Sequence, residues 1–96
     1  MKLLHVTFHY EFSDAVEAIL ERHEIRAYVH YPMMHGKDSD GKHYGTKVFP
    51  GAISVVQAQV EDEKLGEVLE SLSAFKKEKR AHYHLEALVF AVEKSL

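Results

Sequence analysis

The side chains best suited to chemistry in this sequence are its eight histidines, which are scattered along a 96-residue chain that contains no cysteine. Histidine occurs at roughly three to four times its usual frequency in globular proteins. Because imidazoles bind transition metals and change charge near neutral pH, the excess indicates metal binding or pH-sensitive chemistry. The lack of cysteine excludes disulfides, thiolate metal sites and a cysteine nucleophile.

One set of histidines falls on predicted strands. Apolar and polar residues alternate from Lys2 to Tyr10, so His5 and His9 share one face of a first strand. The last strand, predicted as its neighbour in the sheet, would bring His84 and Glu86 alongside them. Imidazoles with a carboxylate suit zinc, nickel, copper or iron. We therefore predict a transition-metal site made of these four side chains.

Other interpretations of the strand histidines stay open. His82 and His84, two positions apart on a strand, form another plausible ligand pair. Alternatively, the histidines are interface residues hydrogen-bonded to polar neighbours, or they form a pH-dependent assembly switch.

A second group of candidate residues lies in a glycine-rich segment over 34–46, which predicts a long exposed loop. His35 and His43 are candidate metal ligands there. Gly36 and Lys37 can offer backbone amides and an ammonium group to an anion such as phosphate. An ordinary solvated loop is the alternative.

The hydrophobic pattern predicts the elements that must position these residues. Strands are expected at 2–10, 25–33, 52–60 and about 82–92, and amphipathic helices at 13–23 and from 62 to about 80. Two helices that each join a pair of strands indicate a ferredoxin-like βαββαβ sandwich of the α+β class. We predict an antiparallel four-stranded sheet with both helices on one face, a long loop between the second and third strands, and a single domain over 1–96.

The sheet face without helices is predicted to be part polar and part apolar. Its predicted members are His5, Thr7, His9, Tyr28, His30, Gln57, Gln59, His82, His84 and Glu86, with Ile53, Val55, Leu88 and Phe90 towards one end. Such a mixed open face is usually covered by another subunit, so we expect a homo-oligomer.

Charge and motifs exclude several classes of function. The net charge of −3 argues against general nucleic-acid binding, which needs a basic face. There is no apolar run long enough for membrane insertion and no signal-peptide pattern, so we expect a cytoplasmic protein. No serine lies in a nucleophile-elbow context, and we expect that the protein is not an enzyme.

The order of elements, the glycine-containing loop, the run Gly-Thr-Lys-Val-Phe-Pro-Gly at 45–51 and the end Leu-Glu-Ala-Leu-Val-Phe-Ala-Val-Glu at 85–93 resemble the PII-like superfamily. This superfamily includes the nitrogen regulatory PII, CutA-like and metal-efflux-associated branches. The resemblance implies a trimer with its open sheet faces turned inward and a long T-loop at about 32–47. It also implies ligand clefts between subunits at the base of that loop, with Gly36, Lys37, Gly45, Thr46 and Lys47 at ligand-binding positions.

The function implied by the resemblance is that of a signalling or regulatory protein. It would bind a metal ion or an adenine nucleotide and act through its loop on a partner protein such as a membrane transporter. The glycine-lysine segment that PII proteins place before the last strand is replaced here by the residues at 80–84, three of which are aromatic. The alternatives are a metal-tolerance protein and a small dimeric ferredoxin-like enzyme.

Overall fold

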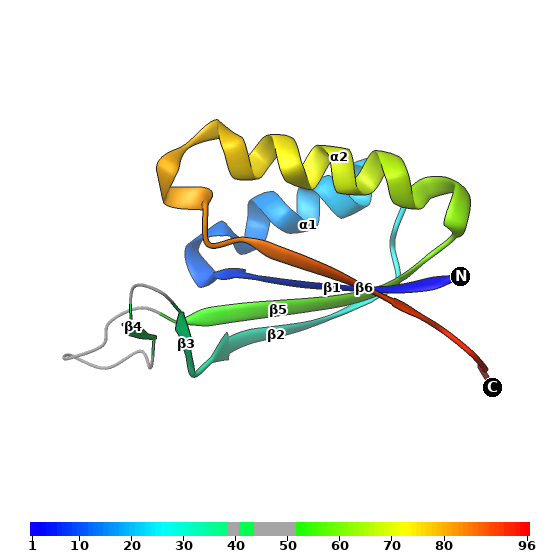
Figure 1. Cartoon of the computed structure of the whole chain (residues 1–96), viewed down its shortest axis with the longest axis horizontal. Helices are drawn as coiled ribbons and strands as arrows, with labels where there is room; N and C mark the ends of the chain where they lie inside the picture. The colour runs from blue at the N-terminus through cyan, green and yellow to red at the C-terminus, as the bar shows by residue number, and fades with distance from the viewer. Residues whose placement is uncertain (39–40, 44–51) are drawn as a thin grey trace.

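The computed structural model describes residues 1–38, 41–43 and 52–96. In chain order its elements are β1 (Lys2–His9), η1 (Tyr10–Phe12), α1 (Ser13–Arg22), β2 (Tyr28–Met34), β3 (Gly36–Asp38), β4 (Gly41–His43), β5 (Ile53–Val60), α2 (Asp62–Glu78), η2 (Arg80–His82) and β6 (Glu86–Ala91) (Figure 1). None of the helices in these ranges is long and apolar enough to cross a membrane.

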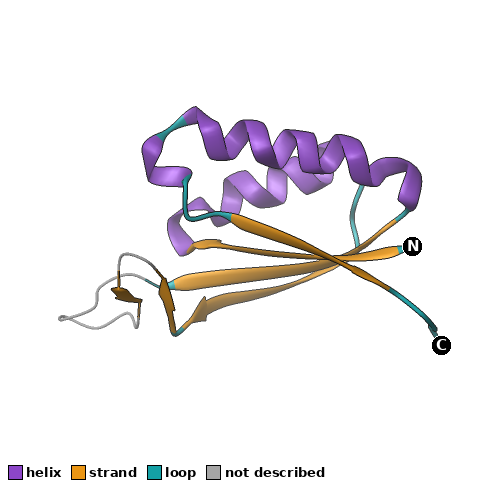
Figure 2. Ribbon diagram, viewed as in Figure 1, coloured by secondary structure: helices purple, strands orange, loops and turns teal. Residues whose placement is uncertain are grey.

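The four long strands form one antiparallel sheet in the order β2-β5-β1-β6. Both helices lie on one face of this sheet, and among the described residues no helix lies on the other face (Figure 2). Each helix connects two strands that have a third strand between them, as the split βαβ arrangement requires. The predicted fold class is therefore confirmed.

The core lies between the sheet and the helices. Alternation on β1 turns Leu4, Val6 and Phe8 towards the helices, and helical spacing on α1 and α2 buries Leu20 and Leu72 against them. Burying a side chain of this size stabilises a fold by roughly 1.5–3 kcal/mol relative to leaving it in water. This apolar layer fixes the strands from which the polar side chains of the open face project.

The prediction of which β2 side chains face the helices was wrong. Tyr28 and His30 were expected on the open face, but they pair with helix-facing residues of β5, and Val29 and Tyr31 take the open face instead. A shift of one residue turns every side chain of a strand to the other face. The orientation that turns His30 towards the helices is stabilised because its Nδ1 lies 2.7 Å from a carboxylate oxygen of Glu17 on α1.

The last strand begins later than predicted. The chain makes η2 and a turn after α2, and β6 starts only at Glu86. As a consequence His82, which was predicted on the open sheet face, is buried beneath the end of α2. The alternating apolar residues that follow concealed this turn in the sequence.

The segment predicted as an irregular loop contains ordered backbone. β2 extends to Met34, and β3 and β4 pair with each other as a short two-stranded ribbon, with Gly36 opposite His43. The ribbon lies at the end of the sheet away from both chain termini (Figure 1). Of the predicted ligand-binding positions, Gly45, Thr46 and Lys47 lie outside the described residues.

Candidate functional site

A cavity of about 230 Å³ lies at the end of the sheet next to β3, and we call it the loop-end cavity. Residues from β1, β3, β5, β6 and the turn before β6 line it: Thr7, Phe8, His9, Gly36, Lys37, Ile53, His84 and Glu86. Five of these residues were predicted from the sequence as metal or anion ligands. The cavity thus joins the two predicted sets of candidate residues.

Strand register places the first part of this lining. Thr7 of β1 is the direct partner of Glu86 on β6, and His9 is the partner of Ile53 on β5. Directly opposed residues in an antiparallel sheet lie side by side on the same face. β1 therefore brings a hydroxyl and an imidazole, and β6 a carboxylate, to one end of the open face, where β5 contributes the apolar side chain of Ile53.

Three rings form a stack beside the cavity. The His84 ring lies 4.9 Å from the His9 ring, centroid to centroid, with 30° between the planes. Tyr83 precedes His84 in the turn, and the centroids of these two rings lie 4.0 Å apart. Offset stacking of aromatic rings is worth about 0.5–1.5 kcal/mol beyond the area that it buries. The stack holds the turn before β6 against β1.

His82, which sequence reasoning placed wrongly, fixes the position of that turn. Its Nδ1 lies 2.7 Å from the carbonyl oxygen of Phe75, and because a carbonyl can only accept, the ring nitrogen donates. The imidazole also stacks on the Phe75 ring at 3.9 Å and 9°, and it meets the edge of Phe12 at 4.6 Å. The end of α2 is thereby tied to the residues that carry His84.

The backbone at Gly36 passes close to β5. A Cβ atom at this position would lie 2.4 Å from Cδ1 of Ile53, well inside van der Waals contact. Glycine therefore allows the base of the ribbon to approach the cavity wall, which places the neighbouring Lys37 on the lining.

The charges of the lining are mixed. Lys37 supplies an ammonium group and Glu86 a carboxylate, while the imidazoles of His9 and His84 can donate or accept hydrogen bonds. Such a site suits a small ligand that has both an anionic part and hydrogen-bond donors.

His5 lies apart from this cluster. Its Nδ1 accepts a hydrogen bond of 3.1 Å from the Gln57 amide, whose oxygen accepts one of 3.4 Å from the Tyr31 hydroxyl. On the other side the His5 ring meets Phe90 edge-on at 6.4 Å. These contacts match the interpretation of His5 as a hydrogen-bonded residue of the open face, in a polar row that crosses three strands.

The two predicted loop ligands are placed differently. His35 is exposed between β2 and β3, and His43 is placed only by its backbone pairing with Gly36. Within residues 1–38, 41–43 and 52–96, no group of three histidine, aspartate or glutamate side chains is arranged to hold a metal ion. Metal binding by His5, His9, His84, Glu86, His35 and His43 stays a prediction.

On the helix-facing side of the sheet, Tyr28 has a raised pKa. Burial is the main cause, and the charges of Glu17 and Glu21, together with a hydrogen bond to Glu21, raise the pKa further. The phenol at the start of β2 therefore ionises only at a higher pH than an ordinary tyrosine.

Comparison of structures finds proteins similar to this chain, whereas comparison of sequences finds no match. No protein-family model and no curated protein sequence matches the chain. Among solved structures, CPII from Thiomonas intermedia K12, a nitrogen regulatory PII-like protein bound to ADP, AMP and bicarbonate, matches with a TM-score of 0.75 and 22% identity. This match covers 93% of the present chain and 88% of the CPII chain.

Two further structures agree with this match. The apo form of CPII gives a TM-score of 0.67 at 20% identity, covering 95% of this chain and 89% of CPII. A candidate PII-like signalling protein from Thermus thermophilus gives 0.67 at 15% identity, covering 92% of this chain and 82% of that protein. The resemblance predicted from the sequence is confirmed at the level of structure: this chain has the fold of the PII-like proteins.

Proposed function

We propose that this chain is a PII-like signalling protein that binds an adenine nucleotide at the loop-end cavity. The observation that carries the proposal is the lining of that cavity, where Lys37 from the base of the ribbon meets two imidazoles and a carboxylate. CPII, which shares the fold, binds ADP, AMP and bicarbonate. The proposal assigns the cavity a binding role and no catalysis.

The charges support a nucleotide in particular. The ammonium group of Lys37 would attract phosphate oxygens. The carboxylate of Glu86 would repel phosphate but accept hydrogen bonds from ribose hydroxyls. A nucleotide carries both kinds of group, whereas a bare metal ion would be repelled by Lys37.

A second copy of the chain would complete the site. The cavity of about 230 Å³ is smaller than the roughly 300–1,000 Å³ of most small-molecule sites. The open sheet face exposes large apolar side chains, including Val29 at 54%, Phe90 at 49% and Leu88 at 45%. We propose that this face packs against other copies in a homo-oligomer, a trimer by resemblance, and that ligands bind in the clefts between subunits.

Signalling requires a partner, and we propose that the segment at about 32–47 supplies the contact. Its base, at Gly36 and Lys37, is part of the cavity lining, so a ligand bound there would touch the start of the segment directly. In this proposal the ligand-bound segment acts in the cytoplasm on a partner protein, for which a membrane transporter is the expected class.

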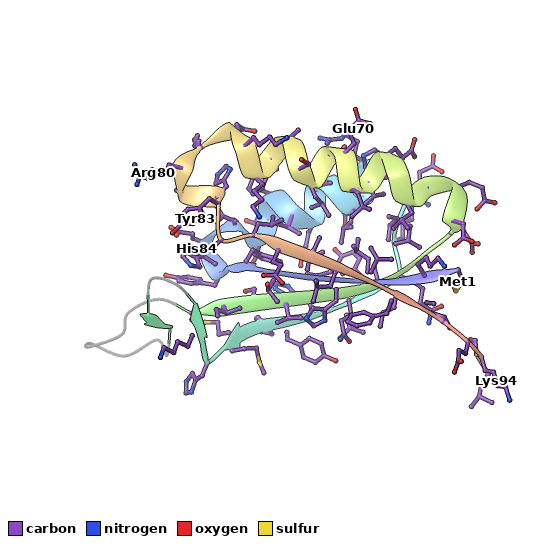
Figure 3. The ribbon with its side chains drawn as sticks, viewed as in Figure 1. Met1, Glu70, Arg80, Tyr83, His84 and Lys94 are labelled. Atoms are coloured by element: carbon purple, nitrogen blue, oxygen red, sulfur yellow. The ribbon has the colours of Figure 1, made fainter. Side chains whose placement is uncertain are left out.

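The test is calorimetric titration of the chain with ADP, AMP and bicarbonate, with the native mass followed by light scattering. We expect saturable nucleotide binding that weakens in Lys37→Gln and is unchanged in the control Lys94→Gln, whose lysine lies at the opposite end of the molecule (Figure 3). Absence of nucleotide binding would refute the proposal. Saturable binding of zinc or copper instead would support the metal-tolerance alternative.

A further inference from the structure

Charge is strongly segregated along α2. Residues 76–80, at the carboxyl end of the helix and the start of η2, hold four cations and one carboxylate, a net charge of +3. The whole chain carries −3, so all other residues together carry −6. Four of the twelve lysine and arginine residues thus lie within five consecutive positions.

The opposite end of the helix has the reverse sign. Residues 61–70 hold five carboxylates and only Lys64 as a cation, a net charge of −4. The helix dipole favours this polarity, but it amounts to about half an elementary charge at each end. The helix dipole alone therefore does not account for four cations at the carboxyl end.

The basic residues are free to meet an external partner. Lys76, Lys77, Lys79 and Arg80 are all exposed. In the described part of the chain, the side chains of these four form no hydrogen bond or ion pair. Lys64 behaves differently, because its ammonium group is 3.2 Å from the His23 carbonyl oxygen and 3.5 Å from a Glu24 carboxylate oxygen.

This basic group lies at a functional end of the molecule. Figure 3 places Arg80, Tyr83 and His84 together at the end that carries β3, and Met1 and Lys94 at the opposite end. Tyr83 is 45% exposed beside the cations. We call Lys76, Lys77, Lys79, Arg80 and Tyr83 the basic end.

We propose that the basic end docks the protein on an anionic lipid bilayer. Lysine side chains are flexible point charges that need no shaped receptor, so a surface of laterally mobile phosphate headgroups can meet all four cations at once. Tyrosine is enriched in the headgroup region, because its ring contacts apolar lipid there while its hydroxyl contacts water and polar headgroups.

The acidic end of α2 gives the contact an orientation. An anionic bilayer attracts the basic end and repels residues 61–70, so the molecule settles with the β3 end towards the lipid. Contact is peripheral, since no helix in the described ranges can cross a membrane. Docking would hold the loop-end cavity and the ribbon close to membrane-embedded partners.

Vesicle flotation tests this inference with the full chain. We expect the protein to float with vesicles of phosphatidylcholine mixed with phosphatidylglycerol, to stay behind with pure phosphatidylcholine, and to be released by high salt. Each cation near an anionic surface contributes about fivefold to partitioning, so Lys76→Gln with Lys77→Gln should weaken binding by roughly 30-fold.

The matched control is Arg26→Gln with Lys94→Gln, which changes the net charge equally at exposed sites elsewhere and should leave vesicle binding nearly unchanged. The pair Lys79→Gln with Arg80→Gln provides a second disruption, and thermal melts confirm that each variant is folded. Equal losses in all double variants would overturn the inference, because net charge and not the basic end would then decide binding. Binding to soluble polyglutamate but not to anionic vesicles would also overturn it, in favour of an acidic protein partner.

Discussion

The imidazole of His84 stacks on that of His9 at a centroid distance of 4.9 Å, although 74 residues separate them in the chain. One ring comes from β1 and the other from the turn before β6. The turn is held in place by His82, which binds the end of α2. A continuous series of contacts therefore connects the helix layer to the loop-end cavity.

The first prediction concerns the role of His84 in ligand binding. We expect His84→Ala to weaken ADP binding at least fivefold, because a ring and a hydrogen-bonding nitrogen of the cavity wall are lost. His84→Phe keeps a ring for stacking on His9 but has no nitrogen, so it should melt like the unmodified protein and still bind ADP less tightly. Unchanged ADP affinity in His84→Ala would show that the nucleotide binds elsewhere.

The second prediction concerns metal binding by the strand histidines. Since His5 is hydrogen-bonded to Gln57 and lies apart from the His9–His84 stack, any zinc site on the strands should depend on the stack alone. We expect that His84→Ala lowers zinc affinity and that His5→Ala leaves it unchanged, as measured by competition with a chromogenic chelator. Equal losses in both variants would restore the four-residue site predicted from the sequence.

The third prediction concerns the structural role of His82. His82→Ala leaves the partly buried carbonyl of Phe75 without its donor and removes a stacked ring, so it should reduce the free energy of unfolding by about 2 kcal/mol. His82→Phe restores the ring but not the hydrogen bond and should recover part of this loss. Urea denaturation measures both, and equal stability of the two variants would mean that the stack contributes nothing.

The sequence was sufficient for the fold but not for every side-chain position. Strict alternation on β1 and helical spacing on α2 gave the elements, and connectivity then determined the sheet order. β2 was misassigned because tyrosine, valine and histidine alternate there without a clear apolar face, and the phase is settled by the contact of His30 with Glu17. Tertiary contacts of this kind leave no local pattern in the sequence.

The candidate site was predictable in composition but not in grouping. His9, His84, Glu86 and Lys37 were identified by residue type, yet two separate sites were inferred. Their meeting depends on the path of β3 past β5, which no periodicity encodes. His82 was misplaced because the alternating residues after it extend the pattern of a strand through what is a turn.

The fourth prediction concerns the close approach of Gly36 to Ile53. Gly36→Ala should lower stability by up to about 1 kcal/mol and narrow the loop-end cavity, because the new methyl group meets Cδ1 of Ile53. Ile53→Val removes that atom, so the double variant should lose less free energy of unfolding than the sum of the losses in the two single variants. Strictly additive free energies of unfolding would show that the two residues do not interact.

The fifth prediction follows from the raised pKa of Tyr28. Burial, reinforced by Glu17 and Glu21, raises the pKa above the ordinary value of about 10, so the unfolded chain ionises at lower pH than the folded one. The stabilisation due to Tyr28 is therefore complete below about pH 10 and is lost as the pH rises through the folded-state pKa. Urea denaturation at neutral and alkaline pH should show Tyr28→Phe less stable than the unmodified protein at pH 7, by about 1 kcal/mol, with the gap closing above pH 10. A gap that stays constant across this range would mean that the phenol ionises equally readily in the folded and unfolded chains.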